Sequence, residues 1–134
     1  MGDAMTPGKV SKAAAVTGLI PMAHVADVQR SVDFYSLLGM EVRGSLRNPA
    51  RELQWVHLVS DQADIMLTRA SEPFVAGQQA VLFYLYSPNL VALREHLLAN
   101  GIGVSPISYP EYMTKGEICV ADPDGYTLLI GQAG

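Results

Sequence analysis

The chain has 134 residues, 49% of them hydrophobic, with a formal net charge of -4 and a pI of about 5.2. This length and composition indicate one globular domain with a hydrophobic core, and they exclude a disordered chain. The acidic balance argues against a nucleic-acid partner, which usually needs a clustered basic face. No apolar run reaches the roughly 18 residues of a membrane span. Cys119 is the single cysteine, so we expect no internal disulfide and a cytoplasmic protein.

The first part of the chain predicts an arm followed by a set of alternating elements. Residues 1–18 contain an apolar run that is too short for a secretory signal, so we expect an N-terminal arm, either flexible or docked on a partner subunit. Residues 19–25 predict a strand, and Asp27 is placed to begin a helix that ends near Gly39. Three more strands are predicted over 40–46, 52–59 and 64–68.

The same order of elements starts again after a linker at 70–79. Residues 80–86 predict a strand, and Asn89 stands at the start of a helix that has leucines at helical spacing. Residues 102–107 make a poor strand because Pro106 interrupts it. The chain then predicts a hairpin, with strands at 118–121 and 126–130 around the turn Asp122-Pro123-Asp124-Gly125.

The order strand–helix–strand–strand–strand therefore occurs twice. We predict an α+β fold in which two tandem βαβββ modules, at 19–69 and 80–131, form a curled mixed sheet around a cleft. The helices are expected on the convex side of this sheet. One module alone has too few strands to enclose a cleft, so both are needed to form it.

Two stretches carry a resemblance to a known family. Residues 21–35, followed by Leu38-Gly39-Met40, resemble the opening module of the vicinal oxygen chelate superfamily. That superfamily includes glyoxalase I, extradiol dioxygenases and bleomycin-binding resistance proteins. The turn at 122–125 is similar to the Asp-Pro-Asp-Gly hairpin that closes its second module. The resemblance covers residues 19–131 and implies the two-module fold and a homodimer.

The resemblance also implies where a metal would bind. In metal-using members four ligands come from the concave face, two from each module. These positions correspond here to Ile20, Met66, Val81 and Leu129. All four side chains are apolar, and only the thioether of Met66 is even a weak metal ligand. We therefore expect no metal and no other cofactor, and a likeness to the metal-free members that sequester ligands.

Strand alternation predicts the side chains that line the cleft. If Ile20 faces the cleft, Met22 and His24 face it too, and similar alternation applies to the other strands. Tyr109 and Tyr112 are expected on a loop over its mouth. The predicted lining is apolar and aromatic with a few polar groups, as in many small-molecule sites. The candidate site residues are Met22, His24, Trp55, His57, Asp64, Met66, Phe83, Tyr109, Tyr112, Glu117 and Leu129.

Three functions are compatible with this lining. The first, which the apolar ligand positions favour, is a homodimeric binding protein that sequesters an aromatic or antibiotic-like small molecule. The second is a lyase-, isomerase- or dioxygenase-like enzyme with relocated chemistry. In that enzyme His24, His57, Asp64 and Glu117 converge, either around a divalent metal or as a general base. The third is an accessory protein that uses the fold as a dimer platform, for which the sequence offers no positive indication. None of them involves nucleic acid or a membrane.

Overall fold

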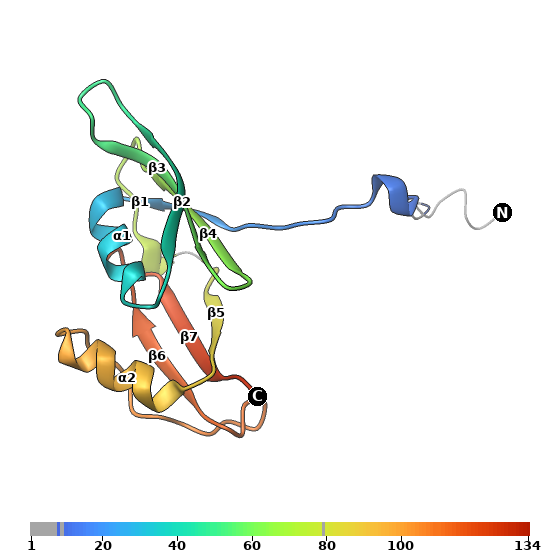
Figure 1. Cartoon of the computed structure of the whole chain (residues 1–134), viewed down its shortest axis with the longest axis vertical. Helices are drawn as coiled ribbons and strands as arrows, with labels where there is room; N and C mark the ends of the chain where they lie inside the picture. The colour runs from blue at the N-terminus through green and yellow to red at the C-terminus, as the bar shows by residue number, and fades with distance from the viewer. Residues whose placement is uncertain (1–7, 9, 79) are drawn as a thin grey trace.

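Two modules follow one another in the computed structural model, which describes residue 8, residues 10–78 and residues 80–134 (Figure 1). The predicted α+β class is confirmed. The first module contains β1 (Met22–Val25), α1 (Val28–Ser36), β2 (Glu41–Arg47), β3 (Leu53–Ser60) and β4 (Ala63–Arg69). The second contains β5 (Phe83–Ser87), α2 (Leu90–Ala99), β6 (Glu117–Ala121) and β7 (Thr127–Gln132). Two short 3-10 helices, η2 (Lys12–Ala14) and η3 (Ala76–Gln78), precede β1 and β5.

The strands form one sheet in each module. The first sheet has the order β1-β4-β3-β2 and the second the order β5-β7-β6. In both sheets the strand before the helix pairs in parallel with the last strand of its module, β1 with β4 and β5 with β7. The curled strand layer that the sequence predicts is therefore built from two sheets, which do not close into a barrel. Helices α1 and α2 lie on the same side of this layer (Figure 1).

The second module has a shorter sheet than the sequence predicts. Within the described residues, the segment 102–107 forms no strand and contributes one isolated bridge, from Val104 to Val120. A second bridge joins Ser108 to Glu117 just beyond it. Pro106 lies between the two bridges and has no amide hydrogen to donate to a ladder. The second module is consequently βαββ, with an irregular segment beside β6.

Local capping explains where the helices begin and end. The side chains of Asp27 and Asn89 each accept the backbone N–H three residues later, at the starts of α1 and α2. Gly39 and Gly101 follow the two helices with positive φ angles of 88° and 79°. The predicted starts and ends of both helices are therefore confirmed.

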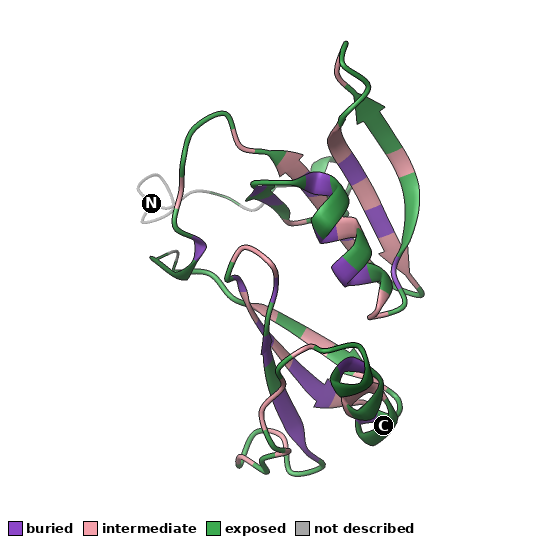
Figure 2. Ribbon diagram, turned by 90° about the vertical axis from the view of Figure 1, so that its left-hand side faces the viewer, coloured by how far each residue is buried: buried purple, intermediate pink, exposed green. Residues whose placement is uncertain are grey.

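The core lies between the helices and the strand layer (Figure 2). Buried and less buried residues alternate along β3 and β4, as expected when one sheet face packs against α1. The same alternation places one face of β7 against α2. The strand residues on the helix-covered face are Val56, Leu58, Ile65, Leu67, Ile118, Val120, Leu128 and Ile130.

A polar joint connects the two modules. Tyr35 on α1 is 1% exposed and donates its hydroxyl to Asp122 Oδ2 at 2.8 Å. Asp122 Oδ1 accepts the backbone N–H groups of Asp124 and Tyr126, each at 2.9 Å. Tyr126 donates its hydroxyl to the carbonyl of His24 at 2.8 Å. Burial and the adjacent carboxylate raise the pKa of Tyr35 above that of an ordinary phenol, so this hydroxyl remains a donor.

The segment before β1 extends away from the two modules (Figure 1). Val16 and Leu19 are exposed along it. The predicted arm at 1–18 lies partly outside the described residues, which omit 1–7 and 9, and the predicted linker at 70–79 includes residue 79, which is also omitted. Among the described residues, the helices are all too short or too polar to cross a membrane.

Candidate functional site

The face of the first sheet that α1 leaves uncovered carries most of the candidate residues of that module. Strand pairing places Met22 beside Met66 and Met66 beside His57, in one row across β1, β4 and β3. A second row runs from His24 through β4 to Trp55. Met22 is 56% exposed, so this face is open to solvent. We call it the first open face; its residues are Met22, His24, Trp55, His57, Asp64 and Met66.

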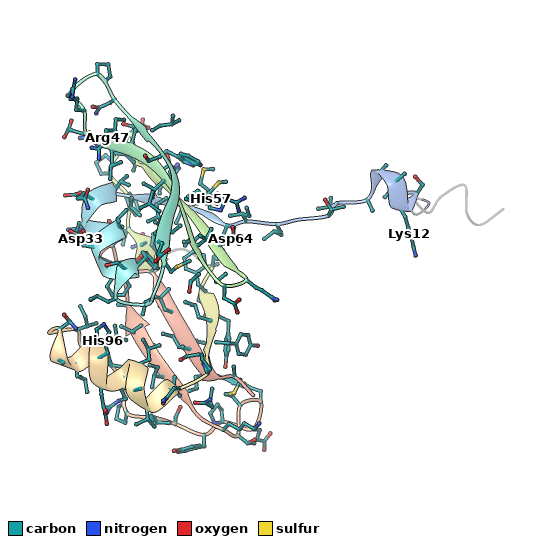
Figure 3. The ribbon with its side chains drawn as sticks, in the orientation of Figure 1. Lys12, Asp33, Arg47, His57, Asp64 and His96 are labelled. Atoms are coloured by element: carbon teal, nitrogen blue, oxygen red, sulfur yellow. The ribbon has the colours of Figure 1, made fainter. Side chains whose placement is uncertain are left out.

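A histidine–carboxylate pair lies on the first open face. Nε2 of His57 on β3 is 2.6 Å from Oδ2 of Asp64 on β4 (Figure 3). The two positions are diagonal neighbours across an antiparallel pair, which brings long side chains into contact. The side chains are 13% and 29% exposed, so the pair is partly shielded and still reachable. The ring centroid of Trp55 is 6.5 Å from that of His57.

The uncovered face of the second sheet differs from the predicted lining. Pairing with β7 places Tyr84 beside Leu129, and Tyr86 two residues further along the same face. Phe83 lies on the opposite face and packs against the core, with its ring 5.8 Å from that of Tyr126. We call the uncovered side the second open face; its residues are Tyr84, Tyr86, Tyr112, Glu117, Cys119 and Leu129.

A nearly buried carboxylate connects three segments of this face. Glu117 on β6 is 6% exposed and accepts the hydroxyl of Tyr84 on Oε2 at 2.6 Å and that of Tyr112 on Oε1 at 2.8 Å. The hydrogen bond to Glu117, with some desolvation, raises the pKa of Tyr84 to about 12 and raises that of Tyr112 as well. Both phenols are therefore neutral donors at neutral pH.

The tyrosine rings gather around this carboxylate. The centroid of Tyr84 is 5.3 Å from that of Tyr86 and 6.5 Å from that of Tyr112, whose plane is nearly perpendicular to it. Gly131 lies opposite Glu117 on β7, and a Cβ there would meet Met113 Cε at 2.7 Å and the Tyr84 hydroxyl at 3.0 Å. The absence of a side chain at Gly131 leaves the space that Tyr84 and Met113 occupy. We call Tyr84, Tyr86, Tyr112 and Glu117 the tyrosine–glutamate cluster.

A hollow of about 320 Å³ lies where the two modules meet. Its volume is at the lower end of the range for small-molecule sites. Among the candidate residues it contains Met22, His24 and Phe83, and Val81 also lines it. Tyr109 is exposed on its loop, near Gly116. The structure thus distributes the candidate residues over two open faces, this hollow and the loop.

The sequence interpretation missed Tyr84 and Tyr86. The run Phe83-Tyr84-Leu85-Tyr86 is apolar or aromatic at every position. Its sequence therefore does not show which two side chains face the core and which two face outward. In the structure Leu128 and Ile130 on β7 are buried and Leu129 is not, so Leu129 marks the uncovered face of this sheet. In a parallel pair the residue beside Leu129 shares its face, and that residue is Tyr84.

The residues at the four positions that the resemblance assigns to a metal do not fit a divalent ion. Ile20, Val81 and Leu129 have no donor atom, and Met66 stands between Met22 and His57. In the part of the chain that the structure describes, no three His, Cys, Asp or Glu side chains gather closely enough to hold a metal. Of the four residues that a relocated centre would use, His57 and Asp64 are in contact. Glu117 lies on the other sheet.

The sequence also matches a family model. The model described as the Glyoxalase/Bleomycin resistance protein/Dioxygenase superfamily matches residues 21–130, which include both modules. The chain belongs to this superfamily. The resemblance seen in residues 21–35 and 122–125 is therefore confirmed. No curated protein matches the sequence.

Several solved structures share the fold of this chain at low sequence identity. A protein named SMU.1112c has a TM-score of 0.71 and 22% identity over 88% of this chain and 100% of its own. A bleomycin-binding protein complexed with bleomycin has a TM-score of 0.69 and 16% identity, over 89% of this chain and 100% of its own. TnmS3, an antibiotic binding protein from Streptomyces sp. CB03234, has a TM-score of 0.67 and 18% identity, over 90% and 98%. At these identities the likeness shows the fold alone.

Proposed function

We propose that this protein binds an aromatic, antibiotic-like small molecule without a metal, as a homodimer. In the dimer, the first open face of one subunit and the second open face of the other enclose the ligand. The observation that carries the proposal is the pair of uncovered sheet faces, which expose apolar and aromatic side chains such as Met22, Tyr86 and Tyr112. Two proteins of the same fold are described as a bleomycin-binding protein and as an antibiotic binding protein, which supports a ligand of this kind.

The physical reason for a second subunit is the cost of leaving these faces in water. A sheet is stable when each apolar face packs against another layer, and here the helices cover one face only. Exposed apolar patches of this kind commonly mark sites of association or ligand binding. A partner subunit would turn two shallow faces into one enclosed groove. Exposed Cys119 on the second open face would remain a free thiol in a reducing cytoplasm.

Binding would depend on apolar contact and a few orienting polar groups. Trp55 supplies the largest flat surface of the first open face. The His57–Asp64 pair and the tyrosine–glutamate cluster supply polar groups on the two faces. The apolar residues at Ile20 and Leu129 favour an aromatic ligand over a bound metal.

A ligand panel together with a mass measurement tests this function. Bleomycin, indole and 2-phenylethanol are titrated into the protein while Trp55 fluorescence and the melting temperature are recorded, and light scattering after gel filtration gives the oligomeric state. We expect a dimer mass, and at least one ligand that changes the fluorescence and raises the melting temperature through mass action. A monomer with no response to any of the three compounds would refute the proposal.

The His57–Asp64 contact supports a second candidate, an enzyme that removes a proton from carbon. A carboxylate hydrogen-bonded to imidazole orients the ring and stabilises the imidazolium that forms when the other nitrogen accepts a proton. The expected reaction class is isomerisation or elimination next to a carbonyl group. This candidate predicts that the protein accelerates exchange of acidic C–H groups for deuterium in D₂O, followed by NMR. His57→Gln should abolish the acceleration, and His96→Gln, which alters an exposed histidine on α2, should retain it. If the C–H groups exchange no faster with the protein than in buffer alone, this candidate is excluded.

A further inference from the structure

We propose that the tyrosine–glutamate cluster is the subsite for a positively charged amino group of the ligand. The ligand class is then narrower than aromatic molecules in general: an aromatic compound that carries an ammonium group. This inference rests on the proposed function, since it assigns a role to one wall of the groove. It adds a charge requirement that the proposed function does not contain.

The first argument concerns charge. Glu117 is nearly buried, and in the described part of the chain it takes part in no salt bridge. Its two hydrogen-bond donors, Tyr84 and Tyr112, are neutral. A carboxylate in this setting is hydrogen-bonded but its charge is not compensated, which is costly at a partly desolvated site. A cation bound above it would supply the missing opposite charge.

The second argument concerns the free lone pairs of the phenols. Each hydroxyl uses its one proton to reach Glu117 and keeps acceptor capacity on its oxygen. An ammonium group carries three donors and no acceptor, so it complements two phenol oxygens that can only accept. Glu117 thereby acts through Tyr84 and Tyr112 and needs no direct contact with the ligand. In this arrangement Glu117 is a positioning residue.

The third argument concerns the rings. Cations are attracted to the faces of aromatic rings, and the attraction grows as the site is desolvated. Tyr86 and Tyr112 are 66% and 62% exposed, so a ligand can reach their rings. The three rings come from two segments, β5 and the loop before β6: Tyr84 and Tyr112 bond to one carboxylate, and Tyr86 lies beside Tyr84. This combination favours an ammonium group over a neutral or anionic one.

The test uses two probes of the same shape. Phenethylamine carries a positive charge at neutral pH, and 2-phenylethanol replaces its amino group with a hydroxyl. Titration of the full-length protein followed by NMR gives both dissociation constants. We expect the amine to bind about tenfold more tightly, the size of one charge-assisted contact. 3-Phenylpropionate, which is anionic, should bind more weakly than either.

The variant Glu117→Gln separates charge from shape. It keeps the side-chain length and one acceptor oxygen, and we expect it to reduce the preference for the amine to about twofold while the affinity for 2-phenylethanol is unchanged. Glu111→Gln removes an exposed carboxylate from the same loop region and should leave the preference intact. Carbon-13 NMR of tyrosine gives an independent readout. The pKa of Tyr84 should decrease from about 12 toward 10 in Glu117→Gln, because the hydrogen bond to Glu117 is its largest cause.

The outcomes distinguish this inference from the proposed function. Equal affinity for the amine and the alcohol in the wild-type protein would overturn the charge assignment and leave aromatic binding in place. Binding of neither probe would overturn the charge assignment, and a response to bleomycin or indole would still support the proposed function. If Glu117→Gln does not fold, the double variant Tyr84→Phe, Tyr112→Phe keeps the rings and removes the hydroxyls. It should reduce the preference in the same way, and an unchanged tenfold preference in that variant would refute the inference.

Discussion

Replacing Trp55 with alanine is expected to weaken the binding of an aromatic ligand about thirtyfold or more, the effect of losing a central aromatic contact at an interface. Trp55 lies on the first open face between its neighbours on β2 and β4. The indole ring lies over Gly44 on β2, where a Cβ would be 3.6 Å from it, an ordinary contact distance. His57 flanks it on the same strand. A preplaced ring of this size provides apolar contact at a low entropic cost.

The measurement is isothermal titration calorimetry with the tightest ligand of the panel, on the wild-type protein, Trp55→Ala and Trp55→Phe. The phenylalanine variant keeps a flat ring and should lose less affinity than the alanine variant. Val91→Ala changes an exposed apolar residue on α2, on the helix side of the strand layer, and should bind like the wild type. Melting temperatures establish that each variant is folded. Full affinity in Trp55→Ala would remove the first open face from the ligand site.

The variant Asp122→Ala is expected to lower the free energy of unfolding by about 3 kcal/mol, because it leaves buried donors without an acceptor. The Tyr35 hydroxyl and two backbone N–H groups, those of Asp124 and Tyr126, all donate to this carboxylate. Asp122 itself is 5% exposed, so water cannot readily replace it. Because this joint connects α1 to the last hairpin, we also expect the two modules to lose part of their cooperativity in unfolding.

Urea denaturation measures the loss. Glu95→Ala removes an exposed carboxylate from α2 and should change the free energy of unfolding by no more than about 0.5 kcal/mol. The double variant Tyr35→Phe, Asp122→Ala should lose less than the sum of the two single losses, because the two groups share one hydrogen bond. A loss below about 1 kcal/mol for Asp122→Ala would show that the joint is not a major source of stability.

The local elements of the fold are readable from the sequence because each depends on neighbouring residues. The turn at 122–125 needs an acceptor at Asp122 and a residue that tolerates a positive φ at Gly125, and both are present at the expected spacing. The starts of α1 and α2 depend on the caps Asp27 and Asn89 in the same way. In β3 and β4, polar and apolar residues alternate clearly enough to assign Trp55 and His57 to the face opposite Val56 and Leu58.

The segment 102–107 was predicted as a strand, and the structure, which describes all of its residues, has none there. Its residues are apolar enough for a strand, but a strand requires a continuous ladder with a neighbour. Pro106 interrupts that ladder, and the segment keeps one isolated bridge to β6. Whether such a segment forms a strand depends on the neighbouring strand it would pair with, and the residues of the segment itself do not show this.

The second open face depended entirely on tertiary structure. Every residue from Phe83 to Tyr86 is apolar or aromatic, so the sequence does not show which side chains face the core. Pairing with β7 places Tyr84 and Tyr86 on the uncovered face. Glu117 joins Tyr84 and Tyr112 because β5, β6 and a loop meet there. The residue types, the caps and the turn were thus available from the sequence alone. The grouping of Glu117 with three tyrosines was not, because it arises from contacts between segments distant along the chain.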